Sequence, residues 1–283
     1  MQDPFHDGER QMQERAGERE MALRVGGMLG DAVPQRAIPF LAEQRMLAVG
    51  TVDAAGAPTA SLLLGARGLA MADDDGRAVS IDRRRLLGED APWALDRDVG
   101  LLAIDLATRR RLRVNGVVRA LDGARVEIEV RQSYPNCPKY IQRRELRADR
   151  GPRLGARGLA LVERADTLFV ASRHPTAGVD VSHRGGAPGF VRRLGRARLR
   201  IPDYRGNGMF NTLGNFLVDP RAGLVVPDFE RGVLLQMSGT ATVGLEGGRH
   251  WDFEVLDWRE LAIPPGLGWE LIDFSPHNPA VLE

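Results

Sequence analysis

The sequence predicts a mainly β protein with short helices, an α+β fold built as two tandem small β-barrels that form an internal pseudo-dimer. Three observations lead to this prediction. Much of the chain is written twice, its apolar runs are short and separated by turn residues, and few segments have helical periodicity. Short strands with frequent turns are typical of small barrels. A seam between two related barrels is also a favourable place for a ligand.

The internal repeat consists of three ungapped blocks in the same order. The matched blocks are 47–65 with 168–186, 100–116 with 223–239, and 126–130 with 251–255. Ser61 and Ser182 lie 121 positions apart, whereas Gly100 and Gly223 lie 123 apart. Because the separation changes only by loop-sized steps, we interpret the blocks as two copies of one unit.

The elements follow one another in the same order in both copies. Ahead of the first copy, residues 33–46 predict a short helix with Ile38 and Leu41 on one stripe. Residues 46–64 then form an apolar run, a turn with Asp, Gly and Pro, and a second apolar run, which predicts a hairpin. Further strands are expected at 100–105, 111–121 and 124–130, and in the second copy at 223–229, 233–245 and 250–258.

These elements divide the chain into three parts. Residues 1–32 form an N-terminal helical extension that belongs to neither copy, 33–148 the first barrel and 149–283 the second. The boundary is expected within the polar, Gly- and Pro-containing segment 145–158.

Composition excludes several classes of protein. The net charge of +1 gives no general attraction to nucleic acid or to anionic membranes, and we interpret the basic runs at 82–87 and 108–113 as solvated faces. A single cysteine, Cys137, excludes an internal disulfide framework and a multi-cysteine metal site. The charged N-terminus does not resemble a secretory signal, and no apolar run is long enough to span a membrane. We therefore expect a cytoplasmic protein.

The two copies differ most after their hairpins. The second copy has the Gly- and Asn-rich sequence IPDYRGNGMFN (201–211) where the first has the charged SIDRRRLLGED (80–90), although Asp82 and Asp203 still align. A turn of this composition before a helix start can bring backbone N–H groups, an arginine and amides to one place, as in an anion site. The alternative is an ordinary β-turn with a capping Asn.

The hairpins differ in the same sense. His183 and Arg184 replace Leu62 and Leu63 of the first copy, so the second copy is polar where the first is apolar. Two histidines without a third ligand do not predict a metal site, and a buried or phosphate-facing His183 is favoured. The asymmetry predicts one ligand site per chain, on the second copy.

The segment YPNCPKYIQRR (134–144) contains the only lysine of the chain, Lys139, and the only cysteine, Cys137. Lysine supplies a compact point charge that arginine cannot, so we interpret Lys139 as a residue that reaches a phosphate or a reduced, electron-rich ring. Cys137 is expected to be a packing residue rather than a nucleophile, since no histidine lies close to it in the sequence.

The chain resembles the FMN-binding split-barrel family related to pyridoxamine 5′-phosphate oxidase, and within it the tandem-barrel flavin-nucleotide-binding branch. The resemblance rests on 5–17, 136–144, 172–191 and 201–215, and it extends over nearly the whole chain. It implies FMN at the interface between two barrels, with the cofactor on the second barrel and a degenerate site on the first.

The resemblance also implies which residues bind the cofactor. The second hairpin is expected to run beside the isoalloxazine and ribityl chain, the segment after it to hold the phosphate, chiefly through Arg205, Asn207 and Asn211, and the end of the first copy to reach across the seam. The expected cofactor-binding residues are His174, Asp180, Ser182, His183, Arg184 and Gly185, then Pro202, Asp203, Arg205, Gly206, Asn207 and Asn211, and Asn136, Pro138, Lys139 and Tyr140. No residue is assigned a catalytic role, and no metal is expected.

The function predicted from these residues is an FMN-dependent oxidoreductase acting on an unidentified small molecule. A non-catalytic flavin-binding or electron-carrying module is one alternative, and a haem- or deazaflavin-binding relative is another. The oxidase's pyridoxal-phosphate-binding residues have no convincing match, and no nicotinamide-binding glycine fingerprint follows a strand. A small-molecule substrate or a redox partner is therefore expected, and the chain could form a homodimer.

Overall fold

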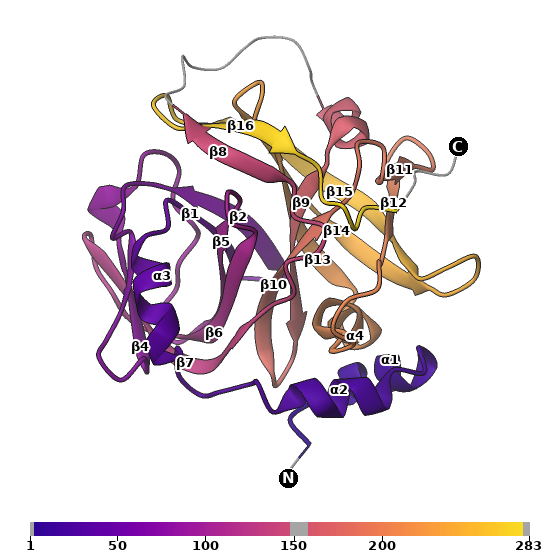
Figure 1. Ribbon diagram of the computed structural model, residues 1–283, viewed down its shortest axis with the longest axis horizontal. Coiled ribbons are helices and arrows are strands. Elements are labelled where there is room, and N and C mark those ends of the chain that lie inside the picture. The colour runs from indigo at the N-terminus through magenta and orange to yellow at the C-terminus, as the bar shows by residue number, and fades with distance from the viewer. Residues whose placement is uncertain (1–2, 148–157, 280–283) are drawn as a thin grey trace.

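The computed structural model describes residues 3–147 and 158–279 and is mainly β with short helices (Figure 1). Two seven-stranded antiparallel sheets form most of it, one from each half of the chain. A third sheet pairs β8 (Arg143–Arg147) with β16 (Gly268–Asp273) and so ties the first half to the C-terminal part of the second. The predicted fold class is confirmed at this level, and within the described ranges neither large sheet closes into a full barrel.

The first sheet has the strand order β2-β1-β5-β6-β7-β4-β3. Its strands are β1 (Met46–Val52), β2 (Pro58–Leu64), β3 (Ala70–Ala72), β4 (Ala78–Asp82), β5 (Asp98–Asp105), β6 (Arg110–Leu121) and β7 (Arg125–Pro135). The second sheet has the order β10-β9-β13-β14-β15-β12-β11. Its strands are β9 (Thr167–His174), β10 (Gly178–Gly185), β11 (Arg192–Arg193), β12 (Arg198–Pro202), β13 (Arg221–Asp228), β14 (Val233–Gly244) and β15 (His250–Ala262). The two orders are the same when corresponding strands are compared.

Strand registers agree with the alignment of the two copies. In the first hairpin Val49 pairs with Ser61, and in the second Val170 pairs with Ser182. The pairing of β6 with β7 is interrupted after Asn115, and that of β14 with β15 after Ser238, which is the aligned residue. A shared β-bulge at one aligned position is a specific feature, because a bulge re-aims the strand that carries it.

One aligned pair needs correction. Asp82 pairs with Arg125, whereas Pro202 pairs with His250, and Arg125 and His250 are equivalent in the two sheets. Pro202 therefore occupies the place of Asp82. Asp203 lies one residue further on, in the loop that leaves β12.

Helices are few and short, as the sequence predicted. The α-helices are α1 (Asp7–Arg15), α2 (Arg19–Gly26), α3 (Ile38–Ala42) and α4 (Asn211–Val218), and the 3-10 helices are η1 (Gln35–Ala37), η2 (Arg83–Arg85) and η3 (Gly158–Arg164). The helix predicted within 33–46 is α3, and its residue Leu41 is fully buried. Most of the expected boundary segment, 148–157, lies outside the described residues.

The N-terminal helices lie under α4 of the second half, and the chain then crosses to the first half (Figure 1). Helix α1 lies very close to α4, because a Cβ added to Gly8 would lie less than 3.0 Å from the backbone of Gly214. Further along, Gly30 pairs with Ser133 of β7. The N-terminal segment is therefore packed against both halves.

Three apolar clusters form the core, and their positions follow from strand alternation. Leu47 and Val49 point into a cluster inside the first half, whereas Met46 and Ala48 point into a cluster shared with the second half. That shared cluster includes Phe169 and Val181, both fully buried. The strands at the seam are buried on both faces, which explains their nearly continuous apolar sequences.

The basic run 108–113 is not the solvated face that the sequence predicted. Arg113 is only 4% exposed, and Arg109 donates to the carbonyl of Ile141. The run lies at the start of β6, where strand alternation turns Arg111 and Arg113 to the same side. The run at 82–87 agrees better with the prediction, since Arg84 and Arg85 are exposed. Among the described residues, no helix has the length and apolarity to cross a membrane.

Candidate functional site

A polar cleft lies between the two halves, on the side of the second sheet where β10 and β12 end. Strand β10, the loop after β12 and the start of α4 form one wall, and β6 with the segment after β7 forms the other. Its interior is about 90 Å³, and about 800 Å³ when the part open to solvent is counted. The interior is narrow because long arginine side chains occupy it.

The structure brings most of the sequence-predicted residues to this cleft. From the second half, Ser182, His183, Arg184, Gly185, Pro202, Asp203, Gly206, Asn207 and Asn211 line it, and from the first half Asn136, Lys139 and Tyr140 do. The two groups are separated in sequence but share one cavity, as predicted for a site at the seam.

Four predicted residues lie elsewhere. Arg205 and Pro138 are exposed and do not line the cleft, and Arg205 contributes only its carbonyl, which accepts from the Tyr140 hydroxyl at 2.9 Å. Asp180 is buried behind the wall, where its carboxylate pairs with Arg113 at 2.9 Å. His174 contacts the N-terminal segment. The structure thus gives no support to Arg205 as the main phosphate ligand.

Arg111 and Arg113 provide much of the positive charge. Arg113 is held by four groups, since it pairs with Asp180 and donates to Tyr134 (2.6 Å), Ser182 (2.5 Å) and Asn211 (2.9 Å). Arg111 has no carboxylate partner among the described residues. Burial, and then the charge of Arg113, lower the pKa of Arg111 to about 9. An anion in the cleft would relieve that charge repulsion.

Arg184 and Arg249 face the cleft from the second half and share one carboxylate. Asp203 lies 3.5 Å from Nη2 of Arg184 and 3.2 Å from Nε of Arg249. Arg249 also pairs with Glu18 from the N-terminal segment. Burial raises the pKa of Asp203, and the two guanidinium groups oppose that rise. Asp203 therefore orients arginines and is poorly suited to touch an anion itself.

The hydrogen bonds of His183 fix which of its ring nitrogens carries the proton. Nη1 of Arg111 lies 3.3 Å from Nδ1, and a guanidinium can only donate. Nδ1 is therefore an acceptor, and Nε2 carries the hydrogen. Burial, then the charges of Arg111 and Arg184, hold the pKa of His183 well below its usual value. The Nε2–H is buried without a partner among the described residues. It calls for an acceptor from a ligand and is not available to bind a metal.

Two residues at the cleft have strained backbone. Tyr140 (φ 66°) and Phe210 (φ 63°) adopt the left-handed conformation, which is uncommon for residues other than glycine. Phe210 is the N-cap of α4 and supplies no side-chain cap, so the first N–H groups of the helix are left for another partner. Tyr140 lies against Gly185, where any Cβ would lie less than 3.0 Å from the Tyr140 carbonyl.

Lys139 lines the cleft from the first half, as its position after β7 predicted. No hydrogen bond or ion pair links it to another of the described residues. Cys137 lines the same cleft and is partly buried. The compact ammonium of Lys139 is therefore available to a bound ligand.

Sequence reasoning missed several lining residues. They are Glu18, Arg111, Arg113, Cys137, Tyr204, Phe210, Thr212 and Arg249. A signal for two of them was present, because Arg111 and Arg113 alternate with Leu112 and Val114 along a predicted strand. Glu18 could not have been found in this way, since its place depends on how the N-terminal helices pack.

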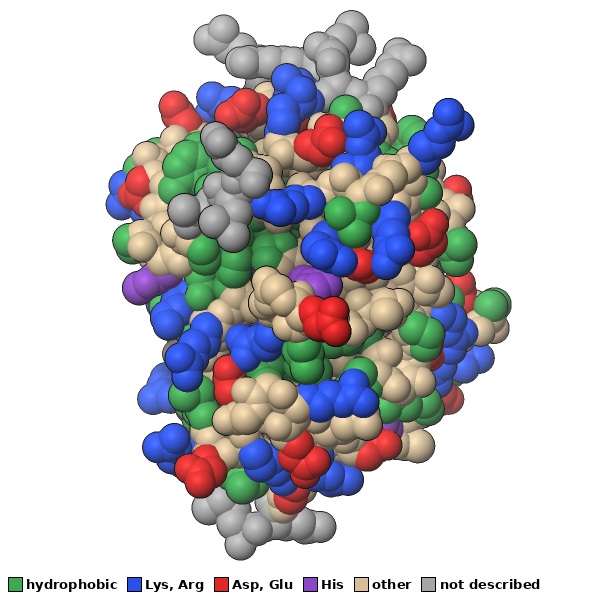
Figure 2. Space-filling view, turned by 90° about the vertical axis from the view of Figure 1, so that its right-hand side faces the viewer, with side chains coloured by type: hydrophobic (Ala, Val, Ile, Leu, Met, Phe, Trp, Pro, Cys, Tyr) green, Lys and Arg blue, Asp and Glu red, His purple; other side chains and the backbone are tan. Residues whose placement is uncertain are grey.

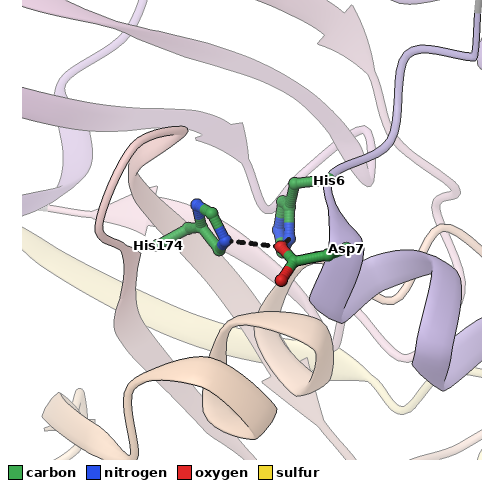
Figure 3. Close-up of side chains that lie close together, drawn as sticks. All are labelled: His6, Asp7 and His174. Atoms are coloured by element: carbon green, nitrogen blue, oxygen red, sulfur yellow. Dashed lines mark hydrogen bonds and ion pairs between the residues drawn. The ribbon is translucent and has the colours of Figure 1, made fainter.

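His174 lies with His6 and Asp7 in the one group of three potential metal ligands found among the described residues (Figure 3). Nε2 of His174 is 2.8 Å from Asp7, while Nδ1 accepts from the backbone N–H groups of Thr176 and Ala177. Nε2 therefore carries the hydrogen and donates to Asp7. A metal would need that nitrogen free, so the arrangement is better suited to hold α1 in place than to bind an ion.

Charged side chains of both signs are mixed over the face shown in Figure 2. This agrees with the net charge of +1, whereas several arginines gather in the lining of the cleft.

Comparison with known proteins gives little. No family model matches the chain, and no curated protein does. Among solved structures, HupZ from Group A Streptococcus is similar at 14% identity over 36% of this chain and 94% of its own, with a TM-score of 0.30. An F420 reductase is similar at 20% identity over 35% of this chain and 95% of its own, with a TM-score of 0.21. MrkH from K. pneumonia, in complex with c-di-GMP, is similar at 11% over 83% of each chain, with a TM-score of 0.22. At such scores, these likenesses carry no argument about function.

Proposed function

We propose that the protein is an FMN-binding flavoprotein and an FMN-dependent oxidoreductase that acts on a small molecule. In this proposal the two halves are tandem split barrels that form an internal pseudo-dimer, and one FMN lies in the cleft. The observation that carries the proposal is the group of cationic side chains around one cleft, Arg111, Arg113, Arg184, Arg249 and Lys139, with buried donors that lack partners.

The residues present fit an anionic ligand with further hydrogen-bond acceptors. Nε of Arg111, Nε of Arg184 and Nε2 of His183 are buried without hydrogen-bond partners among the described residues. Such groups cost about 1–3 kcal/mol each when buried and unpaired, so a ligand that accepts from them is strongly favoured. The narrow interior suits a compact group such as a phosphate, and the open part can take a ring system.

The residues would share the work of binding as follows. Arg111, Arg184 and the N-terminus of α4 would hold the phosphate, because they combine positive charge with free N–H groups. His183 would donate its neutral N–H to an acceptor of the cofactor. Lys139 would place its charge beside the ring system from the opposite half. Bound FMN would supply hydride transfer, while the protein orients it and tunes its charge.

A flavin carrier without a substrate is the second candidate. Its support is that two titratable residues of the cleft are poorly placed to exchange a proton, since His183 stays neutral and Asp203 is held between two arginines. Haem binding gains no support from His183, because Nε2, the nitrogen that Arg111 does not contact, carries a hydrogen.

Titration of the purified protein tests the proposal. We expect flavin absorbance and a stoichiometry of one FMN per chain, with riboflavin bound more weakly because it lacks the phosphate. Two equivalent flavins per chain, or no binding of any flavin, would contradict the proposal. Turnover of a reduced nicotinamide with an artificial electron acceptor would then distinguish an enzyme from a carrier.

A further inference from the structure

The cleft has an apolar counterpart, also lined by residues of both halves, at equivalent positions of the two copies. Ser61, Leu62 and Leu64 of β2 line this second pocket, and they match Ser182, His183 and Gly185 of β10. Leu234 and Gln236 of β14 match Arg111 and Arg113 of β6 in the same way. The strand pairings support these matches, since Gly100 pairs with Asn115 as Gly223 pairs with Ser238.

The rims of the two sites also correspond. Leu261 and Ala262 at the end of β15, and Pro264 and Pro265 after it, line the apolar pocket. They stand 125 positions after Asn136, Cys137, Lys139 and Tyr140. The loop 87–90 forms the other rim, as the loop leading to α4 does in the cleft. The two rims of the apolar pocket meet at Gly88, where an added Cβ would lie less than 3.0 Å from Pro264.

The second pocket has fewer cationic side chains than the cleft. Leucines stand in place of Arg111, His183 and Asn136, and a proline in place of Lys139. The remaining cation, Arg259, is paired with Glu89 at 3.3 Å and donates to Gln236 at 2.7 Å. An anionic ligand would therefore find no free positive group among the described lining residues.

The pocket is nevertheless open and well formed. Its interior is about 370 Å³, or about 950 Å³ with the part open to solvent, which lies within the range of about 300–1,000 Å³ common for small-molecule sites. The floor consists of buried Leu62, Leu64, Val225 and Leu234, whereas Leu87 at the mouth is 46% exposed. Such a lining favours an apolar ligand by about 25 cal/mol for each Å² buried.

One polar group in the floor is left to fix orientation. Ser61 is 8% exposed. Among the described residues that line the pocket, its side chain has one hydrogen-bond partner, Gln236, from which its hydroxyl oxygen accepts at 3.3 Å. Its hydroxyl hydrogen can therefore be donated to a ligand. The amide of Gln236 already donates to the carbonyl of Ala60 and accepts from Arg259.

We propose that this apolar pocket, lined by Ser61, Leu62, Leu64, Leu87 and Leu234, binds a neutral, largely apolar small molecule with one hydrogen-bond acceptor. The duplicated unit would thus keep two sites at equivalent positions that differ in polarity. This inference does not depend on the identity of the ligand in the polar cleft.

A fluorescence titration of the full chain with N-phenyl-1-naphthylamine tests the inference. We expect saturable binding of one neutral probe per chain, at least ten times tighter than that of the anionic analogue 8-anilinonaphthalene-1-sulfonate, and unchanged by saturating FMN. Leu87→Asp, at the exposed mouth, should weaken the probe at least tenfold without loss of folding. Leu256→Asp is the matched control, since Leu256 is 72% exposed and lies outside the pocket.

Three results would overturn the inference. They are the absence of saturable probe binding, equal weakening by Leu87→Asp and Leu256→Asp, and displacement of the probe by FMN. A fourth is a wild-type dimer by light scattering that becomes a monomer in Leu87→Asp, because the pocket would then be covered by a second copy of the chain.

Discussion

Arg111 donates a hydrogen bond to Nδ1 of His183 across the seam between the two halves, at 3.3 Å. The contact joins β6 of the first half to β10 of the second, and it leaves the Nε2–H of His183, a residue that lines the cleft, buried without a partner among the described residues. The Arg111 cation thus makes Nδ1 of the neutral His183 an acceptor and Nε2 the donor. Neither half could build this arrangement alone.

The first prediction concerns the anion. Arg111→Ala should weaken FMN about 10- to 100-fold, because charge-assisted hydrogen bonds contribute about 1.5–3 kcal/mol and 1.4 kcal/mol is a factor of ten. Riboflavin, which lacks the phosphate, should lose much less. Isothermal titration of both ligands gives the comparison. Arg110→Ala is the control, since Arg110 is exposed and lies over Phe40.

Arg205→Ala should leave both ligands nearly unaffected, because its side chain is exposed outside the cleft. If Arg205→Ala loses more FMN affinity than Arg111→Ala, the phosphate binds at the loop around Arg205, as the sequence predicted.

The second prediction concerns His183. His183→Leu, which installs the residue of the equivalent position 62, should weaken FMN about 5- to 10-fold because a buried donor is lost. His183→Gln keeps an N–H and should recover part of that loss. Because burial holds the pKa of His183 well below its usual value, the wild-type affinity should show no titration of His183 between pH 6 and pH 8. A rise in affinity as the pH falls through 6.5 in wild type, absent in His183→Gln, would contradict this.

Much of the fold could be predicted because the repeat and the strand alternation are local signals. The hairpins and the short helix before β1 follow from runs of apolar residues and turns. The single-residue error at Asp203 arose where sequence identity, rather than strand pairing, set the alignment.

The site was harder to predict, because it depends on contacts between segments distant in sequence. Residues of β10 were found because they are polar where the first copy is apolar, and the 136–140 segment because it holds the only lysine and matches the family resemblance. Arg111 and Arg113 were missed because a run of arginines is usually solvated. Their face of β6 is buried only because the second half packs against it at the seam. Glu18 and Arg249 meet through the packing of α1 and α2, which no local pattern specifies.

The third prediction tests how the N-terminal helices are held. Gly8→Ala should lower the stability by about 1–3 kcal/mol, because the added methyl group would overlap the backbone of α4 at Gly214. Helix propensity alone would favour alanine by up to about 1 kcal/mol, so the two effects have opposite signs. Gly27→Ala is the control, since nothing lies within 4 Å of its Cβ. Equal denaturation midpoints for both variants would show that α1 is not packed closely on α4.

The fourth prediction follows from Glu9, a buried carboxyl group that accepts from Asn211 and from the backbone of His6. Burial raises its pKa from 4.5 to about 8, so the folded state retains a proton that the unfolded state has lost. This group should therefore reduce stability as the pH rises from about 4.5 to about 8. Urea unfolding at several pH values should show that fall in wild type and a smaller one in Glu9→Gln. The slope is the readout, because the amide also changes absolute stability; parallel slopes would contradict the assignment.

The last prediction concerns Lys139. Its ammonium lines the cleft from the first half, opposite the wall that carries Arg184 and the start of α4. Lys139→Ala should leave the fold intact, since the side chain is only partly buried and has no partner among the described residues. It should weaken FMN or lower its reduction potential, because a positive charge beside the ring stabilises the anionic reduced form. Lys139→Arg should not restore the wild-type value, because the planar fork is larger than a point charge and Arg111 and Arg184 already occupy the narrow interior. Cys137→Ser, two residues away on the same rim, is the matched control and should keep both affinity and potential. Potentiometric titration of the four proteins decides the matter: if wild type and both Lys139 variants agree within error, the only lysine of the chain has no role in the site.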